Sequence, residues 1–460
     1  MSARSRLLGF GIGSLLVYGG ITWLSYAFVY GQDHHRRPIF LFVGLYAGAF
    51  VCYLLALRGL AQVPRHRLDA LLVLGFAVLF RVALLFSNPI QEDDFYRYLW
   101  DGKVVASGLN PYSVTPLAVR EENGKSEATQ DYARIPTQDA HFALILARVN
   151  HPEVPTIYPP LAQAVFALTA VVAPGSLVAL RLVFLGFDLG ICGLVLATLK
   201  HLGVSPVFVL IYAWSPLVIK ETINSAHYDV IPTFFLMLSL LLMLKRTALL
   251  AHASLALAIL GKVYPLLLLP VFLGRTWITA GRARAFLGVG VVVAIVALGY
   301  APFRAAGGLL WQGTLAFAER WQTNSLIFPL LHALIGERWV TNIVIAVVSG
   351  GTVLAVLRRY DLWEARTFLW ANFLILGTVF LLSPVGNPWY FLWLVPLLCL
   401  FPLRSWIVLS GLLGLYYLSF YFIYRGTPGT FRWVIWLEYL PFYSLLVWDW
   451  LKIRENPHKT

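Results

Sequence analysis

The chain has 460 residues and a formal net charge of +13, with 35 Lys and Arg against 22 Asp and Glu. Apolar residues make up 59% of it and charged residues only 12%, which is about half the charged share of an ordinary soluble domain. With a mean hydropathy of +0.74, this composition excludes a soluble enzyme, a disordered chain and a nucleic-acid-binding protein. It predicts an all-α polytopic membrane protein.

Apolar runs long enough to cross a bilayer recur along the whole chain. We expect about 12–14 transmembrane helices in one membrane-embedded domain, residues 1–460. The runs lie at 7–30, 39–60, 69–87, 157–173, 178–199, 204–219, 229–244, 248–273, 285–301, 340–357, 367–383, 389–401, 405–423 and 433–451. The first is predicted to be a retained helix, because no small-residue cleavage site follows it.

Positive charges between the runs predict their orientation. Lys and Arg gather at Arg4/Arg6, Arg58/Arg65/Arg67, Arg275/Arg282/Arg284, Arg358/Arg359/Arg366 and Lys452/Arg454/Lys459. Because cytoplasmic loops carry such clusters, we expect the N-terminus inside and segment 89–156 outside. Simple alternation of the runs then places Lys245 and Arg246 outside, although a re-entrant or broken helix between 204 and 273 would change the side of 220–229.

Segment 89–156 is the largest polar stretch, with a net charge of −4 in a chain of +13. Its helical patterning and aromatic residues predict an extracytoplasmic loop with helices folded on the membrane surface. A second polar loop, 302–339, falls on the same side. Cys52, Cys192 and Cys399 all lie in apolar runs and predict neither a disulfide framework nor a zinc site.

The densest group of chemically active side chains is the stretch 92–102, just after the third run. A helix over 93–107 would bring Asp94, Arg97, Tyr98 and Asp101 to one face and would end at Gly108. Two interpretations stay open. One is a surface helix with an internal Asp94–Arg97 ion pair, and the other is a carboxylate at the mouth of a membrane cavity.

The motifs DDFYRYLWDG at 93–102 and GLNPY at 108–112 resemble the first extracytoplasmic loop of GT-C glycosyltransferases. The nearest look-alikes are the polyprenyl-phosphate-mannose-dependent mannosyltransferases. Further short motifs follow in the same order: YPPL at 158–161, SPLVIKE at 215–221, SAHYD at 225–229, KVYP at 262–265, RWQTNS at 320–325 and NPWY at 387–390. The resemblance covers roughly residues 70–400, and the order of the motifs carries it.

The resemblance implies a GT-C-like helical bundle that moves a hexose, mannose in the nearest look-alikes, from a polyprenyl-phosphate donor. The acceptor would be a lipid, a glycan or a protein, and the reaction an inverting single displacement. The active site would lie on the extracytoplasmic side of the bacterial cytoplasmic membrane, in contact with membrane lipid and with no nucleic-acid partner. No cofactor is implied. A divalent cation stays an open alternative. The acidic pair is Asp93-Asp94 and not the Asp-X-Asp of some relatives, and this departure counts against metal binding.

Such a reaction needs a carboxylate to take the proton of the acceptor hydroxyl and cations to offset the charge on the leaving phosphate. We assign Asp94 as the base, with Asp93 as the second choice. Arg304 is a further candidate cation. The residues expected to bind substrate are Arg97, Tyr98, Asp101, Tyr158, His227, Asp229, Lys262, Tyr264, Arg320, Asn324, Asn387, Trp389 and Tyr390.

Several of these residues have a second interpretation. Lys262, deep in an apolar run, costs about 2.5–3.5 kcal/mol on insertion scales and would then snorkel or pair with a carboxylate. Tyr264-Pro265 predicts a helix break there. Residues 221–229 suit either a solvated turn or a cavity wall, and Trp389 and Tyr390 suit either an interfacial belt or a stacking platform.

Two other classes of protein compete with an enzyme. A lipid or solute transporter would also have many spans, but paired halves with matching broken helices are not visible in the sequence. A non-catalytic scaffold or lipid-binding subunit would not need so many carboxylates in one loop.

Overall fold

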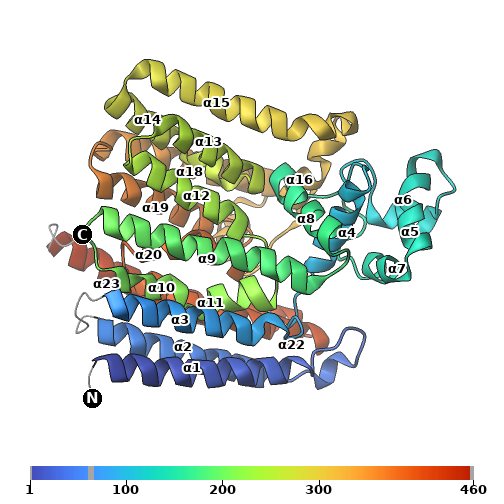
Figure 1. Ribbon diagram of the computed structural model, residues 1–460, viewed down its shortest axis with the longest axis horizontal. Coiled ribbons are helices and arrows are strands. Elements are labelled where there is room, and N and C mark those ends of the chain that lie inside the picture. Colours follow the sequence, from blue (N-terminus) through green and yellow to red (C-terminus); the bar gives the residue numbers. More distant parts are fainter. Residues whose placement is uncertain (1–2, 61–66, 456–460) are drawn as a thin grey trace.

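The computed structural model describes residues 3–60 and 67–455, and this part of the chain is helical without strands (Figure 1). The all-α membrane class is therefore confirmed. The long helices run side by side, and both ends of the chain lie at the same end of the bundle. Arg65 and Lys459, from two of the predicted basic clusters, lie outside the described residues.

Seven helical stretches in the described part of the chain are long and apolar enough to cross a membrane. They are α1 (Ala3–Ser25), α2 (Ile39–Leu60), α9 (Leu177–His201), α15 (Arg282–Tyr300) with η5 (Ala301–Ala306), α18 (Arg338–Arg359), α19 (Ala365–Leu382), and α21 (Arg404–Leu412) with η7 (Leu413–Tyr417) and α22 (Leu418–Tyr424). A bent pair of helices, with a 54° angle, makes an eighth span if counted as one.

Most of the remaining apolar runs form shorter or broken helices, and α3 and α23 are long but are not among the helices that are apolar enough, so fewer helices qualify than the 12–14 runs of the sequence. The bent pair is η2 (Pro206–Val209) with α10 (Leu210–Ala213), followed by α11 (Pro216–Ile219) with η3 (Lys220–Asn224). The others are α3 (Arg67–Leu85), α8 (Pro160–Val172), α12 (Val230–Leu244), α13 (Ala248–Gly261), η4 (Tyr264–Leu268), α14 (Leu269–Ala280), η6 (Pro388–Trp393), α20 (Val395–Leu398) and α23 (Phe431–Glu455).

Prolines mark several of these breaks. Pro160, Pro216, Pro265 and Pro388 each stand in the first turn of a new helix. At that position the missing N–H of proline costs no helical hydrogen bond, and its fixed φ suits the helix. The sequence therefore divides its apolar runs at defined places, and side chains next to these breaks become available to line a cavity.

The structure corrects the expected path of the chain between 157 and 273. Run 157–173 was expected to cross the membrane. However, the turn that follows α8 contacts the large polar segment: the carbonyl oxygen of Gly175 lies 3.2 Å from Nε2 of His141 in this segment. Helix α8 therefore stays beside the polar segment. Run 248–273 was expected to be one span, but it is divided into α13 and α14, which run in opposite directions (Figure 1). The two errors cancel, so the orientation of later helices is unchanged.

Lys245 and Arg246 are consequently on the opposite side from the one expected. The guanidinium of Arg246 lies 5.0 Å from the ring centre of Trp363, and Arg275 of α14 donates to the carbonyl oxygen of Leu362 at 2.5 Å. The turn between α12 and α13 and the second half of α14 thus meet the same connection, the one between α18 and α19, close to the other basic clusters. We call this end of the bundle the basic end, and the opposite end, where 89–156 and 302–339 lie, the loop end.

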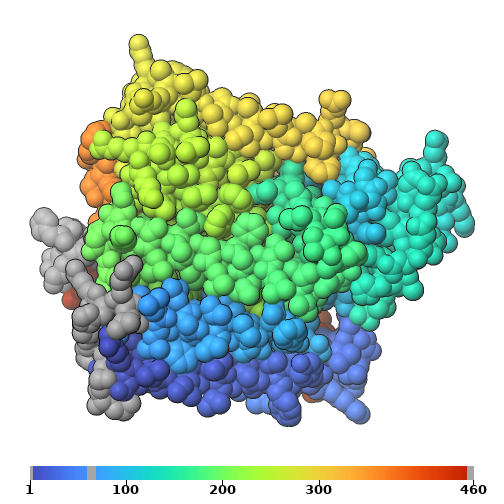
Figure 2. Space-filling model, viewed as in Figure 1, coloured from blue at the N-terminus to red at the C-terminus, as the bar shows by residue number. Residues whose placement is uncertain are grey.

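A lobe of short helices extends from the loop end (Figures 1 and 2). It contains α4 (Phe95–Ala106), α5 (Pro116–Glu122), α6 (Glu127–Gln138) and α7 (Ala140–Ala147). The helix expected over 93–107 is α4, and it ends before Gly108, whose φ of +78° suits glycine. The second polar loop holds α16 (Leu309–Arg320) and α17 (Ile327–Ile335), and the short η1 (His34–Arg36) and η8 (Pro428–Thr430) complete this end.

Helix α4 packs closely on α8 through Gly102. A Cβ atom at this position would lie 2.5 Å from the carbonyl oxygen of Phe166, and a backbone atom in a packed helix cannot move aside easily. Gly102→Ala should therefore lower the free energy of unfolding by about 1–3 kcal/mol, measured as a fall in melting temperature of the detergent-solubilised protein.

Gly75→Ala in α3 is the matched control for this substitution, because nothing lies within 4 Å of its Cβ position. Alanine is also the better helix former, by up to about 1 kcal/mol. The control should be as stable as the unchanged protein or slightly more stable. Equal melting temperatures for the two variants would contradict a tight α4–α8 contact.

Candidate active site

A cavity of about 770 Å³ lies at the loop end, between the lobe and the ends of the long helices. Its wall draws on segments far apart in the sequence: 28–37, 88–98, 148–159, 314–323, 387–393 and 416–424. Ten of the predicted site residues line it: Asp93, Asp94, Arg97, Tyr98, Tyr158, Lys262, Tyr264, Asn387, Trp389 and Tyr390. The predicted motifs therefore do meet in one place.

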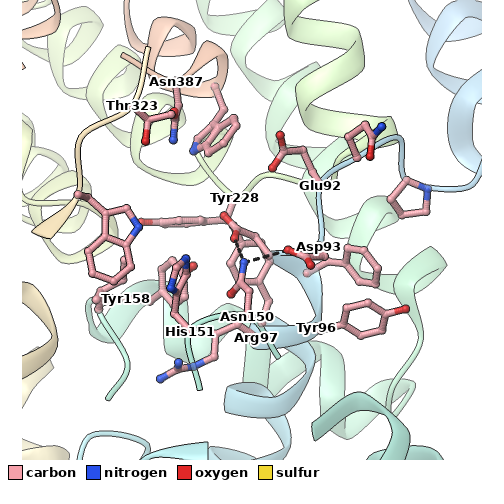
Figure 3. Close-up of a pocket in the computed structure, with 18 of the residues that line it drawn as sticks. Glu92, Asp93, Tyr96, Arg97, Asn150, His151, Tyr158, Tyr228, Thr323 and Asn387 are labelled. Atoms are coloured by element: carbon pink, nitrogen blue, oxygen red, sulfur yellow. Dashed lines mark hydrogen bonds between the residues drawn. The ribbon is translucent and has the colours of Figure 1, made fainter. Parts of the chain in front are cut away.

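Two neighbouring carboxylates are held by one amide (Figure 3). Nδ2 of Asn150 donates to Oδ1 of Asp94 at 2.6 Å and to Oδ1 of Asp93 at 3.0 Å. Asp94 stands at the N-cap position of α4 but makes no cap hydrogen bond, and its side chain is 23% exposed. Its carboxylate is thus oriented from one side and open to the cavity on the other. Asn150 was not predicted, since no motif contains it.

The two acidic residues next to Asp94 hold their protons more strongly than usual. Burial, and then the negative charge of Asp94, raise the pKa of Asp93 to about 6, although the hydrogen bond from Asn150 lowers it. Burial is also the main reason why the pKa of Glu92 is well above its ordinary value. Glu92 belongs to the predicted acidic stretch but was not chosen as a site residue.

The raised pKa of Asp93 predicts a pH-dependent stability. A carboxyl whose pKa is raised by folding gives a stability that is complete below its unfolded pKa and is lost as the pH rises through its folded pKa. Ionisation of Asp93 therefore costs stability above about pH 4, with the full cost reached above about pH 6. Asp93→Asn should melt at a higher temperature than the unchanged protein at pH 8, and the difference should narrow as the pH falls to about 5.

Asp131→Asn, on an exposed face of α6, should show no such pH-dependent difference. A constant difference between Asp93→Asn and the unchanged protein from pH 5 to pH 8 would contradict a raised pKa at Asp93.

The loop that carries these carboxylates is held by two of the spans. Arg181 of α9 is buried and donates to the carbonyl oxygens of Leu85, the last residue of α3, at 2.8 Å and of Ser87 at 2.7 Å. It also donates to the carbonyl oxygen of Asn224, whose side chain accepts from the backbone N–H of Ile90 at 3.0 Å. These bonds satisfy backbone groups that have no helical partner and fix the start of α4.

Arg97 makes a different ion pair from the one expected. Its Nε donates to Oδ1 of Asp101 at 2.9 Å, one turn later in α4, and its Nη1 donates to the carbonyl oxygen of Val154. Gln163 donates to the other oxygen of Asp101 at 3.2 Å. The Asp94–Arg97 pair of the first interpretation is therefore wrong. Asp101 is buried behind the cavity wall and does not line it, whereas Arg97 does.

Lys262 pairs with a carboxylate, as one of its two interpretations required. Its Nζ lies 2.6 Å from Oδ1 of Asp229, which also accepts from Nε1 of Trp393 at 2.8 Å. Lys262 stands directly after α13 and lies 3.8 Å from the ring centre of Tyr390. The predicted helix break is confirmed here, and Tyr264 after it stacks on Trp393 with ring centres 3.7 Å apart.

Residues 221–229 are buried behind the cavity and do not form a solvated turn; of this segment only Tyr228 lines the cavity, so the predicted His227 and Asp229 do not. The side chains of Glu221, His227 and Asp229 are 0–1% exposed. The imidazole of His227 stacks on Trp389 with ring centres 3.9 Å apart, so Trp389 is part of the cavity wall and not an interfacial anchor. The backbone of Asn224 lies beside Ile90, which places this segment near the loop end.

Three predicted cations or amides lie away from the cavity. Arg320 and Arg304 are exposed, at the end of α16 and in η5. Asn324 is buried with its amide directed at the carbonyl oxygen of Gly386 at 3.2 Å. None of them lines the cavity; Trp321 and Thr323 of the same motif do. The error arises because the backbone conformation changes along this motif: Arg320 is the last residue of α16, Trp321 is extended and Asn324 has a φ of +50°, so the side chains do not share one direction.

Two arginines in the cavity wall were not among the predicted residues. Nη1 of Arg148 donates a hydrogen bond to the hydroxyl of Tyr96 at 2.7 Å. The guanidinium lies 4.5 Å from the ring centre of Tyr30. Arg37 donates to Oε1 of Gln91 at 2.9 Å. Within the described residues neither makes an ion pair with a carboxylate. Only their position in the fold distinguishes them from other arginines of the chain.

The described part of the chain offers no evident set of ligands for a divalent cation. Within residues 3–60 and 67–455, no group of three or more His, Cys, Asp or Glu side chains is arranged to hold a metal ion. Asp93 and Asp94 each share one oxygen with Asn150. We therefore derive no step through a metal.

Residues 7–281, more than half of the chain, match a family model described as alpha-(1->6)-mannopyranosyltransferase, N-terminal domain. With its helical membrane fold and carboxylates in a cavity, the protein is an integral-membrane glycosyltransferase. It belongs to the alpha-(1->6)-mannopyranosyltransferase family, so the sugar on which it acts is mannose. The match includes Asp93, Asp94, His227 and Lys262 and ends before 387–393. No curated protein and no solved structure matches the chain.

Proposed function

We propose that this protein transfers mannose from a polyprenyl-phosphate-mannose donor to an acceptor hydroxyl, at the extracytoplasmic face of the bacterial cytoplasmic membrane. The observation that carries the proposal is the partly exposed carboxylate of Asp94 in a cavity that also holds Arg148 and Arg37. A carboxylate and nearby unpaired guanidinium groups are what this transfer requires.

The chemistry is a single displacement with inversion at the anomeric carbon of mannose. The acceptor oxygen forms a bond to this carbon while the bond from the carbon to the phosphate oxygen breaks, and the phosphate leaves with the electron pair. Asp94 takes the proton of the acceptor hydroxyl as a general base. Arg148 and Arg37 offset the charge that grows on the phosphate, because guanidinium groups bind phosphate through charge-assisted hydrogen bonds.

The size and lining of the cavity suit a mannosyl phosphate. Ligand pockets commonly have about 300–1,000 Å³, and this one has about 770 Å³. Aromatic rings of Tyr158, Tyr228 and Trp389 line it and offer flat faces to the sugar. Phe28 and Phe420, near the ends of α1 and α22, add apolar surface where the first isoprene units of a lipid donor would begin.

The distribution of charge supports the proposed orientation. Arg4, Arg246, Arg275, Arg284 and Arg359 gather at the basic end, opposite the cavity. Because cytoplasmic loops are enriched in Lys and Arg, the loop end faces outward in this proposal. Nucleotide sugars are made in the cytoplasm, so a lipid-linked donor is the form of activated mannose suited to an outward-facing site.

The donor can be tested directly. The purified protein in liposomes is given an acceptor-containing membrane extract together with either radiolabelled polyprenyl-phosphate mannose or radiolabelled GDP-mannose. We expect label to move into the acceptor fraction from the lipid donor only. Transfer from GDP-mannose in the absence of lipid-linked mannose would contradict the proposed donor.

The orientation has its own test. A cysteine at Glu121, exposed in α5, should react with a membrane-impermeant maleimide in intact cells, whereas a cysteine at Arg359, exposed at the end of α18, should react only after lysis. The opposite pattern would place the cavity on the cytoplasmic side. The natural cysteines are buried or partly buried, so they add little background.

A further inference from the structure

A histidine behind the carboxylates has no role in the reaction as described so far. His227 is fully buried, and its ring is held flat against Trp389. Its Nδ1 lies 3.0 Å from Oε2 of Glu221. Its Nε2 has no hydrogen-bond partner, yet it lies 3.8 Å from Oδ2 of Asp94 and 3.9 Å from Oε2 of Glu92.

The partners of Glu221 identify which ring nitrogen of His227 carries the proton. The hydroxyl of Tyr417 donates to Oε1 of Glu221, and the hydroxyl of Ser225 donates to Oε2 at 3.2 Å. Nζ of Lys220 lies 3.8 Å from Oε1. Glu221 is thus surrounded by donors and acts as an acceptor, so Nδ1 of His227 donates to it. In the neutral ring Nε2 is then unprotonated and faces Asp94 and Glu92.

We propose that His227 is a positioning residue for the transfer reaction, acting through Asp94: Glu221 fixes the imidazole so that its Nε2 receives the proton that Asp94 has taken from the acceptor. This inference rests on the proposed function, in which Asp94 is the base. The arrangement of Glu221, His227 and Asp94 is a carboxylate, an imidazole and a second carboxylate in a row, built from η3, the turn before α12 and the start of α4.

The proton is accounted for at each step. The acceptor hydroxyl gives its proton to Oδ2 of Asp94 as its oxygen bonds to the anomeric carbon and the phosphate leaves. Asp94 passes the proton to Nε2 of His227 and is again ionised. The resulting imidazolium is stabilised by the negative charge of Glu221 until the products leave, and the proton then returns through Asp94, which is open to the cavity, to water. The 3.8 Å separation is too long for a hydrogen bond, and catalytic contacts of this kind commonly tighten only when substrate is bound.

The surroundings of His227 suit this role better than a purely structural one. Its Nε2 shares the lack of a hydrogen-bond partner with Nε2 of His252, but only in His227 does this nitrogen lie within 4 Å of two carboxylates. The charged groups that face it are Glu92, Asp94 and Glu221. Lys220, Tyr416 and Tyr417 lie beside these carboxylates. The carboxylates lie on both sides of the ring, so the positive charge of the imidazolium is offset wherever the proton resides.

His227→Gln tests the proposal, because glutamine fills much of the same space and forms hydrogen bonds but cannot take up a proton. In the liposome assay we expect kcat to fall 10–100-fold with KM for the donor within twofold. In the Asp94→Asn background, His227→Gln should cause no further loss of kcat, because His227 receives the proton only from Asp94. His252→Gln is the control, since His252 is also buried with an unpartnered Nε2 but lies in α13 away from the cavity.

A second measurement does not depend on transferase activity. Protonation of an imidazole stacked on Trp389 quenches the fluorescence of that indole, so the difference between the unchanged protein and His227→Gln reports the titration of His227. Asp94→Asn should move the midpoint of this titration to lower pH, because it removes a negative charge that stabilises the imidazolium.

The outcomes separate the two proposals. An unmoved midpoint in Asp94→Asn, or wild-type kcat in a folded His227→Gln protein, overturns the role of His227. So does an equal loss from His227→Gln with and without Asp94. Absence of transfer from polyprenyl-phosphate mannose with a normally shifted midpoint would instead count against the proposed donor and leave the coupling between His227 and Asp94 supported.

Discussion

Asp94→Asn should lower kcat for mannosyl transfer by about 10²–10⁴-fold, the range that general-base catalysis contributes. The substitution keeps the shape of the side chain and its hydrogen bond from Asn150, but an amide cannot accept the acceptor proton. Binding of the donor should change little, because the proposed phosphate contacts are Arg148 and Arg37. The measurement is a steady-state assay in liposomes with labelled lipid donor.

Asp131→Asn is the matched control for Asp94→Asn. It makes the same chemical change in the same polar segment, but Asp131 is exposed in α6 and pairs only with Arg134 at 3.1 Å. Its activity should equal that of the unchanged protein. Full activity of Asp94→Asn with loss of activity in Asp93→Asn would move the base to Asp93, and full activity in both would remove this pair from the reaction.

Asp188→Ala should give the largest loss of stability among the substitutions described. Asp188 of α9 and Arg81 of α3 form a fully buried ion pair, and the hydroxyl of Tyr212 donates to Asp188 at 2.7 Å. Removing the carboxylate leaves Arg81 as an uncompensated charge among apolar side chains. The loss of one partner from a buried pair costs about 3–5 kcal/mol, seen as a lower melting temperature in detergent.

Asp131→Ala serves as the control for this substitution too, because exposed ion pairs contribute little. The variant should melt within a few degrees of the unchanged protein. If Asp188→Ala proved as stable as Asp131→Ala, the pair between α3 and α9 would not be holding the first helices against the rest of the bundle. Arg81→Ala provides an independent check, since it leaves the opposite charge unpaired.

Local features were predictable where neighbouring residues decide the structure. The helix over 93–107 was close to α4, because its cap and the glycine after it lie within the same short stretch. The break at Tyr264-Pro265 was also predictable, because proline cannot continue a helix. The partner of Lys262 was expected to be a carboxylate, but nothing in the sequence identified Asp229, 33 residues earlier.

Features that depend on the path of the chain were not predictable in the same way. Hydropathy alone does not distinguish a short apolar helix that turns back, such as α8, from one that crosses. The order of the spans was therefore wrong between 157 and 273, and Arg246 was placed at the wrong end. Arg320 and Asn324 were assigned to the site from their motif, but Trp321 and Thr323 line the cavity instead, because the backbone changes from helical at Arg320 to left-handed at Asn324.

The sequence by itself determined the membrane class, the helices and the acidic stretch from which Asp94 comes, because these follow from composition, spacing and residues close together in the chain. Only the tertiary structure decided which groups meet. Asn150 reaches Asp94, Asp229 reaches Lys262, and the unpaired nitrogen of His227 faces Asp94 from another helix. These contacts depend on the packing of distant segments, and the energy of a buried charge or unpaired polar atom is set by its neighbours in space.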